Sequence, residues 1–316
     1  MIINFPTYIF IPSYLIGLIL YKYKWVPNPI MWICKAAKYL EKPLLRHRNK
    51  RIAGIILVTV IVGGSFVISY IVIKLSYIIS PLLGICIAVY IGYLTFWMKS
   101  LDYGTGRVLQ ALKSGDIVSA REKVSKMVNR DTQSLNQEQI IQATIESVAE
   151  NTIDGVISPL IYLISGGAPL ALAYRLINSL DIMVGFKNVK YINFGWAAAK
   201  LDDIANFIPA RITGLLIPLA ALILGKDFKN SFKIMLRDRK KHPSPNSGIP
   251  EAAVAGALGI QLGGDYNEKK SSWRPYIGDK KNILSLEHIK DAVQLMYVTS
   301  LIMFVIGILI VFIIRL

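Results

Sequence analysis

The sequence has few of the residues on which many soluble enzymes depend. Its 316 residues include only two cysteines and three histidines. Because Cys34 and Cys86 are isolated, neither a disulfide framework nor a cysteine-based metal site is indicated. His47, His242 and His288 are too scattered to indicate a zinc site. Walker-type and kinase-type glycine loops are also missing, so any nucleotide is bound by another route.

The residues present in excess are apolar and basic. Hydrophobic residues make up 53% of the chain, charged residues only 18%, and the mean hydropathy is +0.47. This composition is too apolar for an ordinary soluble domain of the same length. The 36 Lys and Arg exceed the 20 Asp and Glu and lie mostly between the apolar runs, as in loops that face an anionic cytoplasmic leaflet. No basic stretch resembles an RNA-binding motif, so nucleic acid is not an expected partner.

The apolar runs predict an all-α, polytopic integral membrane protein. We expect about four clear transmembrane helices, together with broken or re-entrant helices and a cytoplasmic helical insert. The predicted spans are a short or tilted crossing at 7–21, two helices at 52–73 and 77–98 joined by a turn near 74–77, and a last helix at 293–314. The N-terminus lacks a basic region and a cleavage site, so we interpret it as a retained membrane segment.

The predicted organisation has three parts. Residues 1–98 contain the N-terminal membrane helices, 99–155 form the cytoplasmic insert, and 156–316 form a motif-bearing membrane domain with a C-terminal transmembrane helix. Nine basic residues and one acid between Lys22 and Arg51 mark that segment as cytoplasmic. Within the insert, Asn136 is a predicted N-cap for the acidic helix that ends it.

The third part is interrupted by helix breakers. Gly166-Gly167-Ala168-Pro169 divides an apolar run into two arms that are too short to span a membrane in the usual way. This pattern predicts a broken helix or a re-entrant hairpin. Residues 184–204 are interpreted as a polar and aromatic loop. Gly259 and Gly263, four residues apart in a run of small residues, are predicted to pack closely against another helix.

The acidic helix over residues 138–154 is the most distinctive polar segment. Glu146, Glu150 and Asp154 recur every four residues, so a helix places the three carboxylates on one face. Because like charges at this spacing repel one another, the stripe indicates a divalent metal or a basic partner. A solvated acidic face is the alternative. The three residues are therefore candidate metal ligands.

Further candidates lie in and beside the apolar runs. Arg175, Asn178 and Asp181 share a helical face, and ionisable groups at membrane depth are costly, which favours a functional role over a structural Arg175–Asp181 pair. The predicted substrate- or nucleotide-binding residues are Arg175, Asn178, Asp181, Arg211, His242, Ser244 and Asn246. The predicted catalytic residues are Asp202, Asp203, Lys187 and Glu251.

This inventory indicates phosphate chemistry. Carboxylates without thiols select a hard cation such as Mg²⁺, and Mg²⁺ usually binds together with phosphate oxygens. Nearby Lys and Arg would neutralise the remaining phosphate charge. Three classes fit: a membrane prenyltransferase with Asp202-Asp203-x-x-Asn206 as its diphosphate motif, an ATP-dependent ligase, and a transporter with a site at the broken helix. The transporter fits less well because most polar clusters fall in loops.

Several long motifs resemble a known family. They are Glu146-Ser-Val-Ala-Glu-Asn-Thr-Ile-Asp-Gly-Val-Ile-Ser-Pro, Gly166-Gly-Ala-Pro, Tyr174-Arg-Leu-Ile-Asn-Ser-Leu-Asp, Leu201-Asp-Asp-Ile-Ala-Asn, His242-Pro-Ser-Pro-Asn and Tyr276-Ile-Gly-Asp. The chain is similar in these motifs to the adenosylcobinamide-phosphate synthase family, integral membrane enzymes of cobalamin biosynthesis. The resemblance is detailed between residues 100 and 280 and extends by hydropathy over the whole chain.

The resemblance implies an amide ligation that uses ATP and Mg²⁺. Aminopropanol or aminopropanol phosphate would be joined to the carboxylate of adenosylcobyric acid after ATP activates that carboxylate, and one base would accept a proton from the amine. We assign Glu146, Glu150 and Asp154 to metal or nucleotide, Asp202 and Asp203 to a second metal or the amine, and Lys187, Arg175 and Arg211 to phosphates. The expected surroundings are the bilayer of the cell membrane, with the active face on the cytoplasmic side.

One segment departs from the family pattern. Members usually carry Gly-Asp-Pro and His-Pro near the first membrane segment, whereas this chain has Tyr21-Lys-Tyr-Lys-Trp-Val-Pro-Asn28-Pro. If those residues contribute to the site, this protein supplies the groups differently or has another substrate preference.

Overall fold

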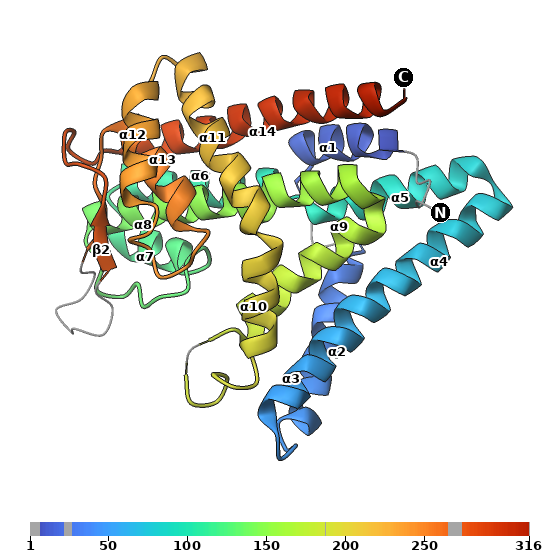
Figure 1. The fold of residues 1–316 in the computed structure, drawn as a ribbon. Coiled ribbons are helices and arrows are strands. Elements are labelled where there is room, and N and C mark those ends of the chain that lie inside the picture. Colours follow the sequence, from blue (N-terminus) through green and yellow to red (C-terminus); the bar gives the residue numbers. More distant parts are fainter. Residues whose placement is uncertain (1–6, 22–26, 187, 265–273, 316) are drawn as a thin grey trace. The chain divides into compact units, whose positions relative to one another are not determined.

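The computed structural model describes residues 7–21, 27–186, 188–264 and 274–315 (Figure 1). The chain divides into two compact units. Unit 1 draws on Met1–Phe96, Ser158–Asn206 and Ile306–Leu316, and unit 2 on Trp97–Ile157 and Phe207–Val305. The first two changes of unit lie within three residues of the boundaries placed at 98 and 155 from the sequence. The later changes divide the predicted membrane domain, 156–316, between the two units.

All regular elements in the described part of unit 1 are helical. Its elements are the 3-10 turn η1 (Thr7–Ile9), α1 (Phe10–Ile19), α2 (Pro29–Leu44), α3 (Lys50–Val58), the π-helical turn η2 (Thr59–Gly63), α4 (Gly64–Ile79), α5 (Pro81–Thr95), α9 (Ser158–Val184) and α10 (Trp196–Ala205). The last turns of α14 (Leu286–Arg315) complete it.

Unit 2 adds one small β-hairpin to its helices. Its elements are α6 (Met98–Lys113), α7 (Ile117–Val124), α8 (Gln137–Thr152), the π-helical turn η3 (Ile153–Ile157), α11 (Phe207–Ile223), α12 (Phe228–Asp238), α13 (Gly248–Leu258), β1 (Leu262–Gly264), β2 (Arg274–Ile277) and most of α14. The two strands pair antiparallel, with Leu262 opposite Ile277.

The all-α membrane architecture is confirmed. Among the described residues, four helical stretches are long and apolar enough to cross a membrane: Lys50–Ile79, Pro81–Lys113, Gln137–Val184 and Leu286–Ile313. The bent pair α10 and α11 passes the same test as a fifth. The crossing predicted at 7–21 is not among them, because α1 has only 10 residues, well below the roughly 17 that a span requires.

The turn between the first two long helices lies further along the chain than predicted. Helix α4 continues through the residues assigned to the turn and ends at Ile79, and Ser80 is extended at φ −159° and ψ 132°. Pro81 then occupies the first turn of α5, where its missing N–H costs nothing. The proline at 81, rather than the polar residues at 74–77, therefore sets the break.

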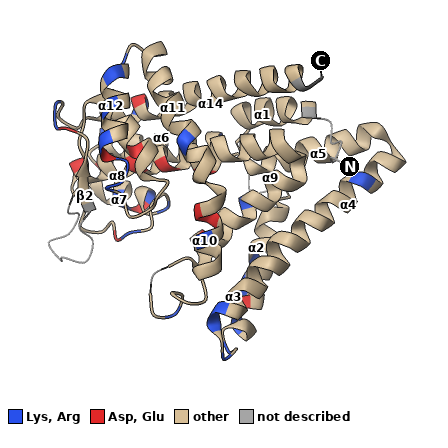
Figure 2. Cartoon of the chain, in the orientation of Figure 1, with Lys and Arg blue, Asp and Glu red and all other residues tan. Residues whose placement is uncertain are grey.

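The side chains of α4 are arranged as in a membrane helix. Ser65, Ser69 and Ser76 are buried together with Ile73, whereas most of the large aliphatic residues of α4, including Ile68 and Ile78, are exposed. Small polar residues facing other helices and large apolar residues facing outward reverse the pattern of a soluble protein, and suit lipid as the surrounding solvent. Figure 2 shows that α4 and α5 carry almost no charge.

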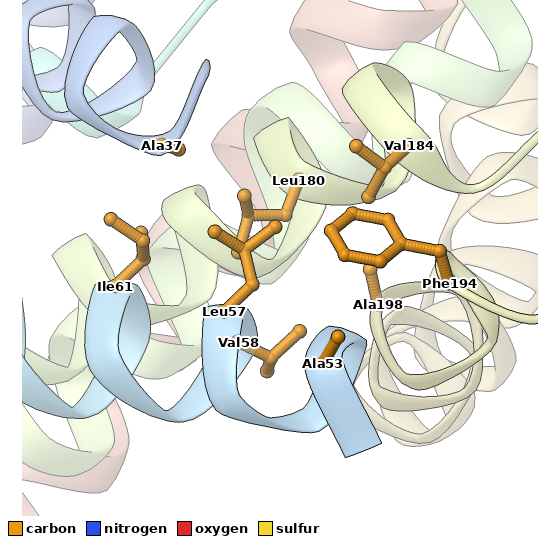
Figure 3. Packing of buried hydrophobic residues seen from close by; sticks show 9 residues of the cluster. All are labelled: Ala37, Ala53, Leu57, Val58, Ile61, Leu180, Val184, Phe194 and Ala198. Carbon is orange, nitrogen blue, oxygen red and sulfur yellow. The ribbon is translucent and has the colours of Figure 1, made fainter. Parts of the chain in front are cut away.

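A hydrophobic cluster joins α2, α3, α9 and α10 in unit 1 (Figure 3). Its buried members are Ala37, Ala53, Leu57, Val58, Ile61, Leu180, Val184, Phe194 and Ala198. Gly54 is required here, because a Cβ atom at that position would lie 1.9 Å from the carbonyl oxygen of Phe194. The interpretation of 184–204 as one loop is wrong in its second half, since burial of Ala198 in this cluster favours helix α10.

The predicted break in the long apolar run is confirmed. Within α9, Gly166 and Gly167 leave the helical conformation, with φ +70° at Gly167, a value that favours glycine. Pro169 follows and cannot donate a backbone hydrogen bond to the preceding turn. Figure 1 shows α9 folding back on itself at this point.

Close packing between α12 and α13 organises unit 2. A Cβ atom at Gly256 would lie 2.5 Å from the carbonyl oxygen of Asn230, so the two backbones touch. Ser231 Oγ donates to the Ala253 carbonyl at 2.8 Å across the same contact. The prediction that Gly259 and Gly263 pack against another helix is wrong, because Gly259 ends α13 in the left-handed conformation and Gly263 lies in β1, where its close backbone neighbour is Pro275 of β2.

Asp238 fixes the end of α12 to the turn after β2. Its fully buried carboxylate accepts two hydrogen bonds from Arg237 and one from the backbone N–H of Gly278, all at 2.8 Å, and pairs with Lys241. Arg237 also contacts Asp279. Burial opposes ionisation of Asp238, but the hydrogen bonds and charges outweigh it and lower its pKa to about 2.

This carboxylate makes stability depend on acid pH. A folded-state pKa below the unfolded value of 3.8 stabilises the protein above pH 4, and this contribution is lost as pH falls through 2. We expect a loss of about 2 kcal/mol in the free energy of unfolding over that window. Unfolding in detergent measured from pH 5 to pH 2, with Asp238→Asn for comparison, isolates the effect. An identical pH dependence in both proteins would contradict it.

Candidate functional site

Helix α8 carries the acidic residues singled out from the sequence. Asn136 caps it in a reciprocal capping box with Gln139, as predicted for the N-cap. Glu146 and Glu150 lie one turn apart, whereas Asp154 falls in η3, where the helix widens to a π-helical turn. Such turns occur frequently at functional sites. Glu150 and Asp154 are half-buried, but only 2% of Glu146 is exposed.

Glu146 is held by protein donors on both of its oxygens. Oε1 accepts from the backbone N–H of Gly263 at 2.9 Å and from Gln142 Nε2 at 3.2 Å, and Oε2 pairs with Arg130. Gln142 also donates to the Gly263 carbonyl. This arrangement ties α8 to β1 and corresponds to the basic partner that the sequence left open for the acidic stripe.

Glu150 faces the loop that precedes α13. Ser247 Oγ donates to Glu150 Oε1 at 2.9 Å. The same loop is folded around Ser244, whose Oγ accepts from the backbone N–H groups of Asn246 and Ser247 at 3.3 Å. The polar residues predicted at 242–247 therefore form one compact turn that contacts the acidic helix.

Arg211 on α11 contacts this loop from another element. Its Nη1 donates to Asn246 Oδ1 at 3.0 Å and to the Phe207 carbonyl at 2.7 Å. The guanidinium lies 3.4 Å from the centroid of the Phe207 ring, in a cation–π contact. Asn246 is buried and Arg211 half-buried, so the pair holds a positive charge at a fixed place on the loop.

His242 and Glu251 form a buried pair at the other side of the loop. The backbone N–H of Ser244 donates to His242 Nδ1 at 2.9 Å, so Nε2 is the nitrogen that carries the proton in the neutral ring. Nε2 lies 3.7 Å from Glu251 Oε1. The loop from His242 to Ser247 thus joins Glu150, Arg211 and Glu251, which the sequence placed far apart.

A second polar cluster lies in unit 1 around Asp202 on α10. Arg175 Nη1 donates to Asn178 Oδ1 at 2.9 Å, and Asn178 Nδ2 donates to Asp202 Oδ1 at 3.3 Å. Asn206 Nδ2 donates to Asp202 Oδ2 at 3.0 Å. Arg175, Asn178 and Asn206 are each at most 2% exposed. Both oxygens of Asp202 are therefore oriented by buried amides.

Residues around this cluster fix it further. Ser158 Oγ and Tyr174 OH donate to Asn206 Oδ1 at 2.7 and 2.9 Å, which sets the direction of its amide. Tyr162 stacks on Tyr174 with ring centroids 4.9 Å apart. The aromatic pair and the serine come from α9, so the buried amide of Asn206 links α9 and α10.

The other predicted residues of unit 1 behave differently. Asp181 interacts electrostatically with Asp202 and so belongs to the cluster. Asp203, one residue further along α10, has a side chain that is 34% exposed and pairs with Lys200 at 3.9 Å. Lys187 lies outside the described residues.

No complete metal cage is formed by the part of the chain that the structure describes. Within it, no group of three or more His, Cys, Asp or Glu residues is placed to hold an ion. Mg²⁺ is usually bound by only one or two protein carboxylates together with waters and substrate phosphates. Glu150 and Asp154 are the half-buried carboxylates of this stripe, and the buried Glu146 accepts protein donors on both oxygens.

Several residues of these clusters were not predicted as site residues. Arg130, Gln142 and the backbone of Gly263 orient Glu146, and Ser247 contacts Glu150. Ser158 and Tyr174 orient Asn206. Arg130 lies at a helix junction, and its ion pair with Glu146 gives it a structural role. Gln142 lies one helical turn before Glu146, a spacing that the sequence does show, whereas the contacts of Gly263, Ser247 and Ser158 join segments distant in sequence, for which helical spacing gives no signal.

The fold and these clusters define a class: a multi-pass helical membrane protein with buried polar clusters of carboxylates, amides and guanidinium groups. The family model described as "CobD/Cbib protein" matches residues 10–296. The chain belongs to this family, the family of adenosylcobinamide-phosphate synthase, as the motif resemblance predicted.

Curated relatives are similar over nearly the whole chain. A protein of Geobacter metallireducens is 44% identical over 87% of each chain, one of Clostridium tetani 45% over 89% of this chain and 90% of its own, and one of Listeria monocytogenes serotype 4b 43% over 97% of each. All three are named "Cobalamin biosynthesis protein CobD". No solved structure matches the chain.

Proposed function

We propose that this chain catalyses an ATP-dependent amide ligation in cobalamin biosynthesis. It would join aminopropanol or aminopropanol phosphate to the carboxylate of adenosylcobyric acid and give adenosylcobinamide or its phosphate. Family membership supports the role in the pathway. The observation that carries the reaction is the loop from His242 to Ser247, which joins a carboxylate, Glu150, to a guanidinium, Arg211, in one hydrogen-bonded turn.

Unit 2 is assigned to Mg²⁺ and the nucleotide. Glu150 and Asp154 would hold Mg²⁺, and Arg211, fixed by Asn246, would neutralise phosphate charge. Mg²⁺-ATP, when bound, supplies the phosphoryl group that activates the corrinoid carboxylate. Glu146 acts here as a positioning residue, because its contacts to Arg130 and Gly263 fix the face of α8 that carries Glu150.

Unit 1 is assigned to the amine. Asp202 would accept the proton that the amine loses when nitrogen attacks the activated carbonyl carbon. Asn178 and Asn206 orient its two oxygens through hydrogen bonds of 3.3 and 3.0 Å. The buried Arg175 is linked to Asp202 through Asn178, and in this assignment it offers positive charge to the phosphate of aminopropanol phosphate.

The proposal is tested with the purified full chain in detergent. Adenosylcobyric acid, aminopropanol phosphate, ATP and Mg²⁺ are incubated with the protein, and the corrinoid is analysed by mass spectrometry. We expect the mass of the amide, dependent on both ATP and Mg²⁺. Absence of the amide, together with transfer of an isoprenyl group in a parallel assay, would instead favour a prenyltransferase.

Glu150→Gln tests the metal assignment. The glutamine amide of the variant can still contact Ser247, but the substitution removes one anionic ligand. We therefore expect the Mg²⁺ concentration for half-maximal activity to rise roughly 10- to 100-fold. Glu138→Gln, an exposed residue on the first turn of the same helix, is the matched control. Equal Mg²⁺ requirements in both variants would remove Glu150 from the metal site.

A further inference from the structure

Helix α2 has an exposed face that the amide ligation does not use. At about 100° per residue, Trp32, Tyr39 and Pro43 lie within about 40° of one another around the helix axis. Trp32 is 60% exposed and Tyr39 73%. Large aromatic side chains exposed on one stripe are typical of an interaction surface.

Basic residues border this aromatic stripe on one side. Lys35, Lys38 and Lys42 follow at spacings of three and four, so they form a parallel row on α2. All three are exposed, as are Arg46 and Arg48 in the turn that follows. Figure 2 shows basic residues gathered where α2 leads into α3. None of the five forms an ion pair with a described carboxylate.

The opposite face of α2 is packed into unit 1. Ile30, Ala37 and Glu41 are buried, and Glu41 accepts hydrogen bonds from Lys190 at 2.9 Å and Tyr191 at 2.7 Å. The only acid of the segment is thereby paired inside the unit. The exposed face of α2 consequently has only positive charge.

The position of α2 places this face beside a membrane entry. The helix has 16 residues and is not among the candidate spans, and the first candidate span begins at Lys50, six residues after α2 ends. Tryptophan and tyrosine concentrate at the level of lipid headgroups, and lysines extend from there to the phosphates. Clusters of Lys and Arg next to a span attract anionic lipids.

We propose that the α2 surface, formed by Trp32, Tyr39 and Lys35, Lys38 and Lys42, binds anionic phospholipid headgroups at the bilayer interface. The aromatic rings contact the glycerol and upper acyl region, and the lysines pair with the phosphates. This surface secures unit 1 against one leaflet independently of the ligation chemistry.

Lipid titration tests the charge of the surface. The full chain in dodecyl maltoside is titrated with phosphatidylglycerol or phosphatidylcholine, and the melting temperature is followed. We expect a rise with phosphatidylglycerol only. At about fivefold per lysine, Lys35→Gln/Lys38→Gln/Lys42→Gln should weaken the apparent affinity roughly 100-fold. The control is Lys229→Gln/Lys233→Gln/Lys240→Gln, which changes three exposed lysines elsewhere and should keep the response.

Three outcomes would overturn the proposal. The first is an equal response to both lipids, and the second is an equal loss of response in both triple variants. The third is an equal rise with soluble glycerol phosphate, which would show that the surface takes a small phosphate ester instead of a lipid.

Fluorescence tests the depth of the surface in a variant that keeps all charges. In vesicles containing brominated phosphatidylglycerol, the emission difference between the unaltered protein and Trp32→Phe reports Trp32. We expect stronger quenching by bromine at acyl positions 6 and 7 than at 11 and 12, as for an aromatic at the interface. No quenching, or stronger quenching by the deeper label, would contradict the interfacial placement.

Discussion

Arg130→Met is expected to lower the free energy of unfolding by about 3–5 kcal/mol. The variant removes the guanidinium that pairs with the carboxylate of Glu146, which is only 2% exposed. Gln142 and the backbone of Gly263 still donate to Oε1, but neither supplies a positive charge. The cost of a buried charge therefore falls on the folded state. Chemical unfolding of the protein in detergent measures it.

An exposed ion pair in the same unit provides the control. Lys126→Met removes the partner of Glu122 in an exposed ion pair with side chains 63% and 69% exposed, and such pairs contribute at most about 1 kcal/mol. Combining Arg130→Met with Glu146→Gln should recover part of the loss. If Glu146 were instead a metal ligand, a chelator would destabilise the protein and Arg130→Met would not. That result would contradict a stabilising ion pair between Arg130 and Glu146.

Asp202→Asn is expected to reduce turnover by at least roughly 100-fold, the smallest usual contribution of a general base. Asparagine has the same shape and keeps an acceptor for Asn178 or Asn206, so the cluster should remain folded. It has no basic oxygen to take a proton from the amine. Single-turnover measurement of amide formation at saturating substrate reports the loss.

Two comparisons make this result specific. Asp131→Asn changes an exposed aspartate to the same residue and should retain full activity. Unfolding of Asp202→Asn should follow that of the unaltered protein, which separates lost chemistry from lost structure. Unchanged turnover in a folded Asp202→Asn protein would remove this residue from the catalytic assignment.

The sequence predicted features within one segment better than contacts between segments. The cap at Asn136 and the break at Gly166-Gly167 were predicted correctly, because each depends on residues within a few positions. The turn before α5 was predicted too early, at 74–77, because Pro81 and not the preceding polar residues determines where α4 ends. Helix α10 was missed because its alanines pack against a cluster built mainly from α3 and α9.

In the polar clusters, too, spacing within one helix was predictable and contacts between helices were not. Helical spacing grouped Glu146 with Glu150, but it could not reveal that Arg130 pairs with the first and Ser247 contacts the second. Adjacent aspartates look equivalent in sequence, yet Asp202 is held by two buried amides and Asp203 pairs with Lys200. Such distinctions depend on which helices meet, and spacing within one helix carries no signal for that.

The most direct test of the proposed ligation follows one oxygen atom. Adenosylcobyric acid labelled with ¹⁸O in its free carboxylate is incubated with the protein, ATP, Mg²⁺ and aminopropanol phosphate, and both products are analysed by mass spectrometry. If ATP activates the carboxylate as an acyl phosphate, the amine displaces phosphate from it, and the inorganic phosphate keeps one labelled oxygen. We predict ¹⁸O in the phosphate and one ¹⁸O in the amide. Amide formation with unlabelled phosphate, or no amide at all, would contradict the proposal.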